Sequence, residues 1–312
     1  MFRLTALRKA ALTLTLLVLA AAAITGDYFA RDIVAEIATL TILVIALELA
    51  AGFGGMVSLA HGAIMGVGAY GYALAGLAGM SAWPASLAGI AAAAIFGGAV
   101  GAACARTEGI FFIMATLAFG QMAWAFTFRA DALGGDNGLG GIDRPSLPFA
   151  DSADPLVFAL YALSVLVLVI LMTVAILRSP FGRSLQAVHE NPARAEAIGL
   201  PARRIRIAGF TLSSALAGMA GVLAAQHIQF VSPDLMIWTA SGEALVVLIL
   251  GGIGTLAGPV LGAAIFVALK HWAAGFTDHW HLLIGALLIL VVLAGGRGLF
   301  GQLETRLRHD RD

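Results

Sequence analysis

Apolar residues occupy most of the chain in long runs that short polar stretches separate. The runs reach about 20 residues, the length an α-helix needs to cross the hydrocarbon layer with its backbone hydrogen bonds satisfied internally. Polar and apolar residues do not alternate, as they would in the strands of a membrane barrel. The pattern therefore predicts an all-α integral membrane protein with a single transmembrane domain over residues 1–312. The predicted spans are residues 10–24, 33–50, 57–79, 83–105, 110–128, 155–177, 207–226 and 282–294.

Composition agrees with this class, since 60% of the residues are apolar and 12% are charged, against roughly 25% charged residues in soluble domains. The formal net charge is +0, so only the distribution of charge is informative. Cys104 is the single cysteine of the sequence, which excludes an intrachain disulfide.

The loops indicate an orientation, because Lys and Arg are retained on the cytoplasmic side when a membrane protein inserts. Residues 1–9 hold three basic residues, and loop 178–206 holds six arginines against two glutamates. Loop 129–154 instead holds five aspartates against two arginines. We therefore expect the N-terminus and loop 178–206 in the cytoplasm and loop 129–154 outside. The tail 297–312, with four arginines, is also expected in the cytoplasm.

The first apolar run also fits a secretory signal peptide, because Arg3, Arg8 and Lys9 precede a short apolar stretch with small residues near its end. The later spans require membrane insertion in any case. An uncleaved first helix is therefore the simpler interpretation.

An apolar region over residues 243–269 is interrupted by the sequence GGIGTLAGP, residues 251–259. Each of its glycines costs about 1 kcal/mol in a helix interior, and its proline costs about 3 kcal/mol. One straight helix here would also give an odd number of crossings and would put the tail outside. We therefore predict about eight crossings plus a broken or re-entrant region that enters and leaves on the outer side or forms two short helices. Such breaks mark transport sites, but glycines also line close helix contacts, and the residues leave both open.

A second glycine-rich stretch, GFGGMVSLAHGAIMGVGAYG, covers residues 52–71 and follows Glu48. Ser58-Leu59-Ala60 in this stretch and Thr255-Leu256-Ala257 in the other each follow a glycine cluster. Internal repeats with broken helices are common in transporters. A match this short in a chain rich in glycine and alanine also arises by chance, so the repeat is a hypothesis.

Polar groups at membrane depth are costly, which makes them candidates for function. Glu36 and Glu243 lie near the ends of predicted spans, where an interface position explains them. His61 lies inside the second glycine-rich stretch, where it either lines a polar path or bridges helices. The candidates for the translocation pathway are Glu48, Ser58, His61, Gln121, Gly251, Gly252 and Gly254.

Motifs of common enzyme classes are missing from the sequence. It contains no GxSxG, HExxH or CxxC, and no phosphate-binding GxxxxGK[ST]. We therefore expect no catalytic residue, no ATP hydrolysis and no cofactor in this chain, and no nucleic-acid partner. The histidines 271, 279 and 281 lie beside Trp272 and Trp280, which is typical of an interfacial aromatic belt rather than a metal site.

The loop over residues 178–206 carries signals for two short helices. Ser179-Pro180 and Asn191-Pro192 are typical helix starts, with a capping side chain before a proline at the first helical position. They predict helices over residues 180–190 and 192–198, the second ending at Gly199. The first helix has an apolar stripe of Phe181, Leu185 and Val188, which needs a cover. Membrane lipid headgroups and a groove in a soluble partner both fit, and the residues alone do not decide between them.

Six stretches are similar to one family of transport proteins. They are SPFGRSLQAVHENPARAEAIGLPARRIRIAGFTLSSALAGMAG (179–221), GFGGMVSLAHGAIMGVGAYGYAL (52–74), GIFFIMATLAFGQM (109–122), GGDNGLGGIDRP (134–145), VSPDLMIW (231–238) and GGIGTLAGPVLGAA (251–264). In this order they resemble the permease subunits of branched-chain amino-acid ABC importers, the LivM type. The resemblance extends over about residues 52–297.

The resemblance implies a multi-pass permease domain of the bacterial cytoplasmic (inner) membrane, with both termini in the cytoplasm. It implies four kinds of partner: membrane lipid, a homologous second permease subunit, two cytoplasmic ATPase subunits that bind ATP and Mg, and an external substrate-binding protein. The implied activity is ATP-driven translocation of branched-chain amino acids by alternating access. Similar permeases serve urea, short amides or aromatic acids, so the substrate stays open. A secondary transporter or a membrane enzyme would need ion-coupling or catalytic residues that the spans do not supply.

The resemblance also assigns roles to the loops. Residues 190–199, within the cytoplasmic coupling loop 178–206, resemble the coupling helix that sits in a cleft of the ATPase. The external loop 129–154 becomes the expected surface for the binding protein. The residues implied in coupling are Glu190, Ala195, Glu196, Ala197 and Gly199.

Overall fold

A computed structural model describes residues 6–146 and 151–275, together with residues 282, 285, 286 and 289. The helices are α1 (Ala6–Thr25), α2 (Tyr28–Glu48), α3 (His61–Leu77), α4 (Ala82–Cys104), α5 (Gly109–Arg129), α6 (Pro155–Arg178), α7 (Pro180–Glu190), α8 (Pro192–Ala197), α9 (Ala202–Ile228), α10 (Trp238–Gly251) and α11 (Ala257–Ala274). A π-helical turn, η1 (Leu49–Phe53), extends α2, and 3-10 turns occur at η2 (Asp131–Leu133), η3 (Gly135–Asn137) and η4 (Pro233–Met236). Two short strands, β1 (Leu139–Gly140) and β2 (Phe230–Val231), pair antiparallel.

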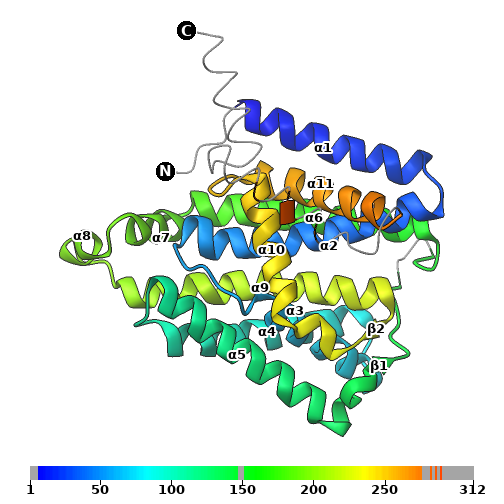
Figure 1. Cartoon of the computed structure of the whole chain (residues 1–312), viewed down its shortest axis with the longest axis horizontal. Helices are drawn as coiled ribbons and strands as arrows, with labels where there is room; N and C mark the ends of the chain where they lie inside the picture. The colour runs from blue at the N-terminus through cyan, green and yellow to red at the C-terminus, as the bar shows by residue number, and fades with distance from the viewer. Residues whose placement is uncertain (1–5, 147–150, 276–281, 283–284, 287–288, 290–312) are drawn as a thin grey trace.

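The long helices lie side by side, and the two loops of opposite charge lie at opposite ends of the bundle (Figure 1). One end carries α7 and α8 and is called the coupling end below. The other carries β1 and β2 and is called the strand end. Seven of the described helices are long and apolar enough to cross a membrane. The prediction of an all-α integral membrane protein is therefore confirmed.

Six predicted spans correspond to α1, α2, α4, α5, α6 and α9. The span predicted over residues 57–79 begins later, at His61, because residues 54–60 are not helical. The last predicted span, 282–294, lies outside the described residues except at positions 282, 285, 286 and 289, and the tail 297–312 lies wholly outside them. The count of eight crossings therefore stays a prediction.

The interrupted region does form two helices, α10 and α11, separated by residues 252–256. The chain turns there through Gly252 at φ 106° and Gly254 at φ 85°, a backbone conformation that favours glycine. The two helices then pack antiparallel, since Gly251 of α10 contacts Gly258 of α11, and a Cβ atom at Gly262, further along α11, would lie 2.6 Å from the carbonyl oxygen of Val247, earlier in α10. The glycines thus break the helix and also line a close helix contact, whereas the role of this break as a transport site stays a prediction.

The centre of the bundle consists of α3, α4 and α9, which approach one another through small residues. A Cβ atom at Gly68 of α3 would lie 2.7 Å from Cα of Gly218 in α9, and one at Gly71 would lie 2.9 Å from Cα of Gly89 in α4. In lipid, helices associate through such close packing rather than through the hydrophobic effect. Larger residues at these positions would push the three helices apart.

Caps mark the helix starts that follow polar turns. Asp27 accepts from the backbone N–H of Ala30 at the start of α2, and Asp154 from that of Leu156 at the start of α6. Ser179 accepts from the N–H of Gly182, and Asn191 accepts from the N–H of Arg194. These last two caps confirm the helix starts predicted for the coupling loop.

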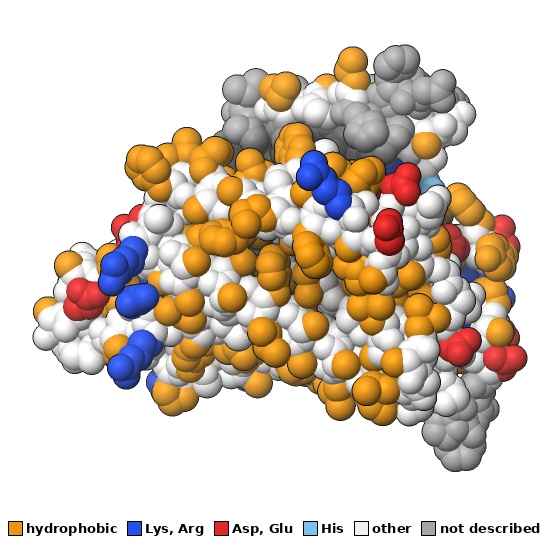
Figure 2. Space-filling model, turned by 90° about the horizontal axis from the view of Figure 1, so that it is seen from below, with side chains coloured by type: hydrophobic (Ala, Val, Ile, Leu, Met, Phe, Trp, Pro, Cys, Tyr) orange, Lys and Arg blue, Asp and Glu red, His pale blue; other side chains and the backbone are white. Residues whose placement is uncertain are grey.

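Exposed charged side chains gather at the two ends of the bundle. Apolar side chains cover the middle of the face in Figure 2, most Lys and Arg side chains cluster near the coupling end together with a few acidic ones, and further acidic side chains lie near the strand end. The exposed arginines at the coupling end are Arg178, Arg183, Arg194, Arg203 and Arg204, and all the aspartates of loop 129–154 are exposed, namely Asp131, Asp136, Asp143, Asp151 and Asp154.

Candidate functional site

The two glycine-rich breaks meet inside the bundle. The N–H of Gly254, in the break between α10 and α11, donates to Oε1 of Glu48, the last residue of α2, at 2.6 Å. Helix α3 begins at His61, directly after the break at residues 54–60. Two sets of polar contacts, Glu48 with Gly254 and His61 with Ser213 beside Gly62 with Ser241, tie the break regions to neighbouring helices, and we call these residues together the break hub.

Glu48 is the acidic member of the hub and has no exposed surface. Its other carboxyl oxygen, Oε2, is buried and has no hydrogen-bond partner among the described residues. Burying a polar oxygen without a partner is costly. Glu48 is therefore not the residue that maximal stability would select at this position.

His61 joins three helices. Its Nε2 atom lies 2.8 Å from Oγ of Ser213 in α9, and the same hydroxyl donates to the carbonyl of Ala46 in α2 at 2.6 Å. Because a serine hydroxyl has one proton to donate, it accepts from His61, so Nε2 of His61 carries the imidazole proton. The ring also packs edge-on against Phe210, with 5.6 Å between the ring centroids.

The first turn of α3 is tied to its neighbours through backbone groups that have no partner within the helix. The N–H of Gly62 donates to Oγ of Ser241 in α10 at 2.8 Å. Just before the helix, the N–H of Leu59 donates to Oγ1 of Thr116 in α5 at 3.2 Å. The start of α3 is therefore fixed by contacts with α5, α9 and α10.

Ser58 and Thr255 play similar local roles in the two breaks. Ser58 Oγ accepts from the N–H of Ala60 at 3.1 Å, and Thr255 Oγ1 accepts from the N–H of Gly258 at 3.0 Å. Each hydroxyl thus orders the chain as a new helix begins. This agrees with the hypothesis of an internal repeat but does not test it.

The remaining pathway candidates differ in position. Gly251 and Gly252 are buried at the break between α10 and α11. Gln121 lies on α5, where its Nε2 atom is buried and has no hydrogen-bond partner among the described residues.

Three cavities lie elsewhere. A cavity of about 440 Å³ between α3, α4 and α5 is lined mainly by apolar side chains, including Tyr70, Phe96, Phe119 and Met122. Cavities of about 500 Å³ and 190 Å³ lie at the strand end. None of the seven pathway candidates lines any of these three cavities. Their role in lining a path stays a prediction.

The coupling loop corrects one inference from its sequence. The apolar stripe of α7 faces the bundle, with Leu185 and Val188 buried and Phe181 partly buried. Leu185 packs against Gly209 of α9, where a Cβ atom would lie 2.8 Å from its Cδ1. The chain itself therefore covers the stripe, and the expectation that lipid or a partner covers it is wrong.

The exposed surface of the coupling loop lies on α8 and the turn after it. Glu190, Glu196, Ala197 and Gly199 are exposed, whereas Ala195 is buried. Gly199 has φ +87° and ends α8, as the sequence predicts. Of the five residues implied in coupling, four are accessible to a partner and Ala195 positions α8 on the bundle.

The coupling loop also contacts the break between α2 and α3, at residues 54–60. The imidazole of His189, in α7, lies against Gly55, whose φ of +68° and missing Cβ leave room for the ring. Gly55 lies seven residues beyond Glu48. The structure therefore brings the coupling loop within one short segment of the break hub.

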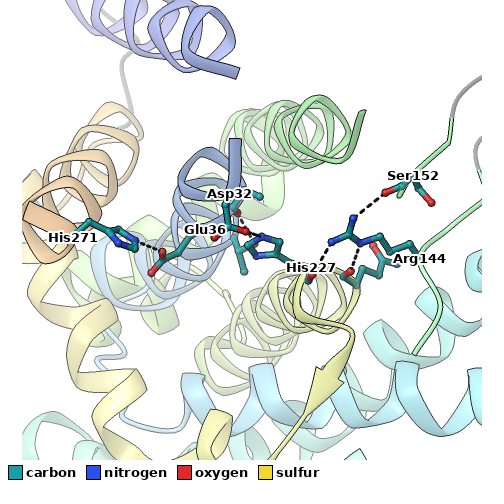
Figure 3. Close-up of polar contacts among 9 residues, drawn as sticks. Asp32, Glu36, Arg144, Ser152, His227 and His271 are labelled. Carbon is teal, nitrogen blue, oxygen red and sulfur yellow. Dashed lines mark hydrogen bonds and ion pairs between the residues drawn. The ribbon is translucent and has the colours of Figure 1, made fainter. Parts of the chain in front are cut away.

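A polar network at the strand end, shown in Figure 3, lay outside the sequence prediction. Asp32 of α2 bonds Nε2 of His227 in α9 at 2.8 Å. One helical turn further, Glu36 accepts from Lys270 at 2.9 Å and lies 2.7 Å from Nε2 of His271 in α11. The network holds the C-terminal ends of α9 and α11 against α2.

Arg144 fastens the external loop to this network. Its guanidinium donates to the carbonyls of Gln226 at 3.1 Å, His227 at 3.0 Å and Ser152 at 3.0 Å. It also stacks over the ring of Phe158, 4.4 Å from its centroid. The sequence carries no signal for this anchor, since Arg144 is one of two arginines in a loop with five aspartates.

Of the three histidines at positions 271, 279 and 281, one belongs to the network at the strand end. His271 bonds Glu36, while residues 279 and 281 lie outside the described part of the chain. No group of three or more His, Cys, Asp or Glu side chains suited to a metal ion occurs among the residues that the structure describes.

A multi-pass helical bundle with two broken helices that meet in a polar hub has the architecture of a membrane transport subunit. The chain belongs to the family described as the permease component of branched-chain amino acid transport systems, which it matches over residues 29–292. This match includes both breaks, the external loop and the coupling loop.

The relatives are transport permeases. The chain is 29% identical over 302 residues to the high-affinity branched-chain amino acid transport system permease protein LivM of Escherichia coli K12, a match that covers 88% of this chain and 71% of the relative. It is 29% identical over 136 residues to LivH of Salmonella typhimurium LT2, which covers 43% and 44% of the two chains. It is 30% identical over 172 residues to the autoinducer 2 import system permease protein LsrC of Escherichia coli O9:H4, which covers 50% and 48%. No solved structure matches the chain.

Proposed function

We propose that this chain is the membrane-spanning permease subunit of an ATP-driven importer that translocates branched-chain amino acids by alternating access. The match to the LivM protein over 88% of the chain is the observation that carries the proposal. A different substrate is less well supported, because the similarity to the autoinducer 2 permease covers half of the chain. The family and these relatives are transport subunits rather than enzymes.

ATP hydrolysis belongs to two partner ATPase subunits in this proposal. The support is the short, capped helix α8, which projects from the coupling end with Glu196 and Ala197 exposed and Ala195 packed inward. A rigid projection of this kind fits a cleft by helix-in-groove packing. Closure of the ATPases would move α7 and α8 together, since a single residue, Asn191, separates the two helices.

A second permease subunit completes the membrane pore. Similarity to both LivM and LivH, two permease proteins named for the same kind of transport system, supports this partner. The substrate-binding protein is proposed to dock at the strand end, where the exposed aspartates gather. On this assignment the strand end faces away from the cytoplasm in the bacterial inner membrane.

The test is uptake by the complete transporter. The chain is co-purified with its second permease, its ATPases and its binding protein, and the complex is placed in proteoliposomes. We expect uptake of leucine, isoleucine and valine that requires internal ATP and is lost when the ATPase cannot hydrolyse it. Uptake driven by an ion gradient without nucleotide would instead favour a secondary transporter. ATP-dependent uptake of urea, a short amide or an aromatic acid, but not of leucine, would overturn the substrate assignment.

A further inference from the structure

Glu48 connects two segments that lie 206 residues apart in the sequence. Its Oε1 atom accepts a hydrogen bond from the N–H of Gly254 at 2.6 Å. Among the described residues, Glu48 is the one acidic residue whose side chain is completely buried. The contact joins the break after α2 to the break between α10 and α11. It is thus a direct link between the two discontinuous parts of the bundle.

The sequence leaves room for this link at Gly52. Gly52 lies in the π-helical turn η1, four residues after Glu48, and a Cβ atom there would overlap with all three carboxyl atoms of Glu48. Residues four apart on a helical turn face the same side. The Glu48 carboxyl group is therefore held between the backbone of Gly52 and the N–H of Gly254.

The other end of the same segment touches the coupling loop. η1 is followed by Gly55, which packs against His189 of α7, and Met56 N–H bonds back to the carbonyl of Ala50 in η1 at 2.8 Å. A displacement of α7 therefore reaches η1 through a short, hydrogen-bonded segment. From η1, the hydrogen bond to Gly254 runs through the carboxyl group of Glu48.

We propose that Glu48 is a positioning residue that makes the two helix breaks move together when the coupling loop is displaced. Its carboxyl group transmits the movement of η1 to Gly254 and so to α10 and α11. Glu48 does not contact the substrate in this role. The inference rests on the proposed function, because the displacement of α7 is the step that ATP closure of the partner subunits would supply.

A merely structural role makes a different prediction. The unpartnered Oε2 atom is a cost to stability, so an apolar side chain of similar size at position 48 is tolerated or stabilising if packing is all that matters. Glu48→Gln keeps an oxygen that accepts from Gly254. Glu48→Met keeps the volume and removes that acceptor.

The first experiment compares these two variants in the complete complex in proteoliposomes. Leucine uptake and ATP hydrolysis are measured together, and thermal unfolding is followed in parallel. We expect Glu48→Gln to keep the wild-type ratio of leucine transported to ATP hydrolysed. Glu48→Met should lower that ratio about fivefold, the change expected for the loss of one hydrogen bond. The unfolding temperature should change little, because the cost of the unpaired Gly254 N–H is offset by the removal of the buried, unpartnered Oε2 atom. An unchanged ratio in Glu48→Met overturns the proposal.

The second experiment uses the space at Gly52. Gly52→Ala should displace the carboxyl group, lower the unfolding temperature and lower the uptake ratio. Adding Glu48→Ala removes the overlap, so the unfolding temperature should recover, while the uptake ratio should stay low because the link is absent. Recovery of both quantities in the double variant would mean that Gly52 and Glu48 matter for packing alone. Gly242→Ala on α10 is the matched control, since nothing lies within 4 Å of a Cβ atom there.

The two failures are distinguishable. Absence of ATP-dependent leucine uptake by the wild-type complex would refute the proposed function. Normal wild-type uptake with a normal ratio in Glu48→Met would refute only the role of Glu48. If Glu48→Met does not assemble, the Gly52→Ala pair decides the question, because its second substitution relieves the steric conflict that the first creates.

Discussion

Two buried serine hydroxyl groups in α9 differ in the hydrogen bonds that they make. Ser213 and Ser214 are neighbours in α9 and both are fully buried. Ser213 bonds His61 and Ala46 in two other helices, whereas Ser214 donates to Phe210 within its own helix. The two residues have the same chemistry, but only Ser213 joins separate elements.

We predict that Ser213→Ala destabilises the protein by about 1 kcal/mol or more, because it leaves the buried Nε2–H of His61 without a partner and removes the hydrogen bond from α9 to α2. Thermal unfolding of the detergent-solubilised protein measures this change. Ser214→Ala is the control and should change stability by less, since a helix carbonyl such as that of Phe210 keeps its backbone partner. Equal effects of the two substitutions would contradict the hydrogen-bond arrangement of the hub.

At the scale of elements, the sequence predicted well those helix starts and ends that depend on neighbouring residues in the chain. Ser179-Pro180 and Asn191-Pro192 start α7 and α8, and Gly199 ends α8, because capping involves only residues within one turn. The break at residues 252–256 likewise follows from clustered glycines, whereas the glycine-rich stretch 52–71 is broken only at residues 54–60 and is helical from His61 on.

The parts that were missed depend on contacts between distant residues. The pairing of Glu48 with Gly254 and the burial of the α7 stripe against α9 are set by how helices pack, and periodicity along one helix does not identify its neighbour. Ser213 and Arg144 were likewise unremarkable in the sequence, because a single polar residue in an apolar run or loop does not reveal its partner.

For α8, we predict that Glu196→Trp leaves membrane insertion and thermal stability unchanged but lowers leucine uptake per ATP hydrolysed by about tenfold. Glu196 is exposed on α8, so the bulky ring disturbs the proposed ATPase cleft rather than the bundle. The measurement is the uptake ratio of the complete complex in proteoliposomes. Arg183→Trp, on the exposed side of α7, is the control. Unimpaired uptake in Glu196→Trp would count against α8 as the coupling helix.

For the external loop, we predict that Arg144→Lys loosens the segment from Leu139 to Asp143. A lysine cannot reach all three carbonyls that the guanidinium fork binds, and it also loses the stacking on Phe158. Amide hydrogen exchange in this segment should accelerate about tenfold, which corresponds to about 1.4 kcal/mol. Arg129→Lys at the end of α5 is the control and should leave the exchange unchanged.

At the scale of the whole molecule, the two ends of the bundle carry opposite charge around an apolar middle (Figure 2). Arginines at the coupling end fit the anionic surface and the positive-inside rule. The aspartates at the strand end have no such explanation from the membrane. Under the proposed function these aspartates face the binding protein, and charged groups at the rim of an interface mainly accelerate association.

This separation of charge gives a prediction that involves the complete transporter. Replacing the five aspartates of loop 129–154 by asparagine should lower the association rate of the binding protein about tenfold at low salt, with a smaller effect on its dissociation rate. The difference should fade near physiological salt, where the Debye length is about 8 Å. Stopped-flow fluorescence with labelled binding protein and the complex in nanodiscs measures both rates. Replacing Arg178, Arg183 and Arg194 by glutamine at the opposite end is the control and should leave the association rate unchanged. An association rate that is insensitive to the aspartates at every salt concentration would place the docking surface elsewhere on the strand end.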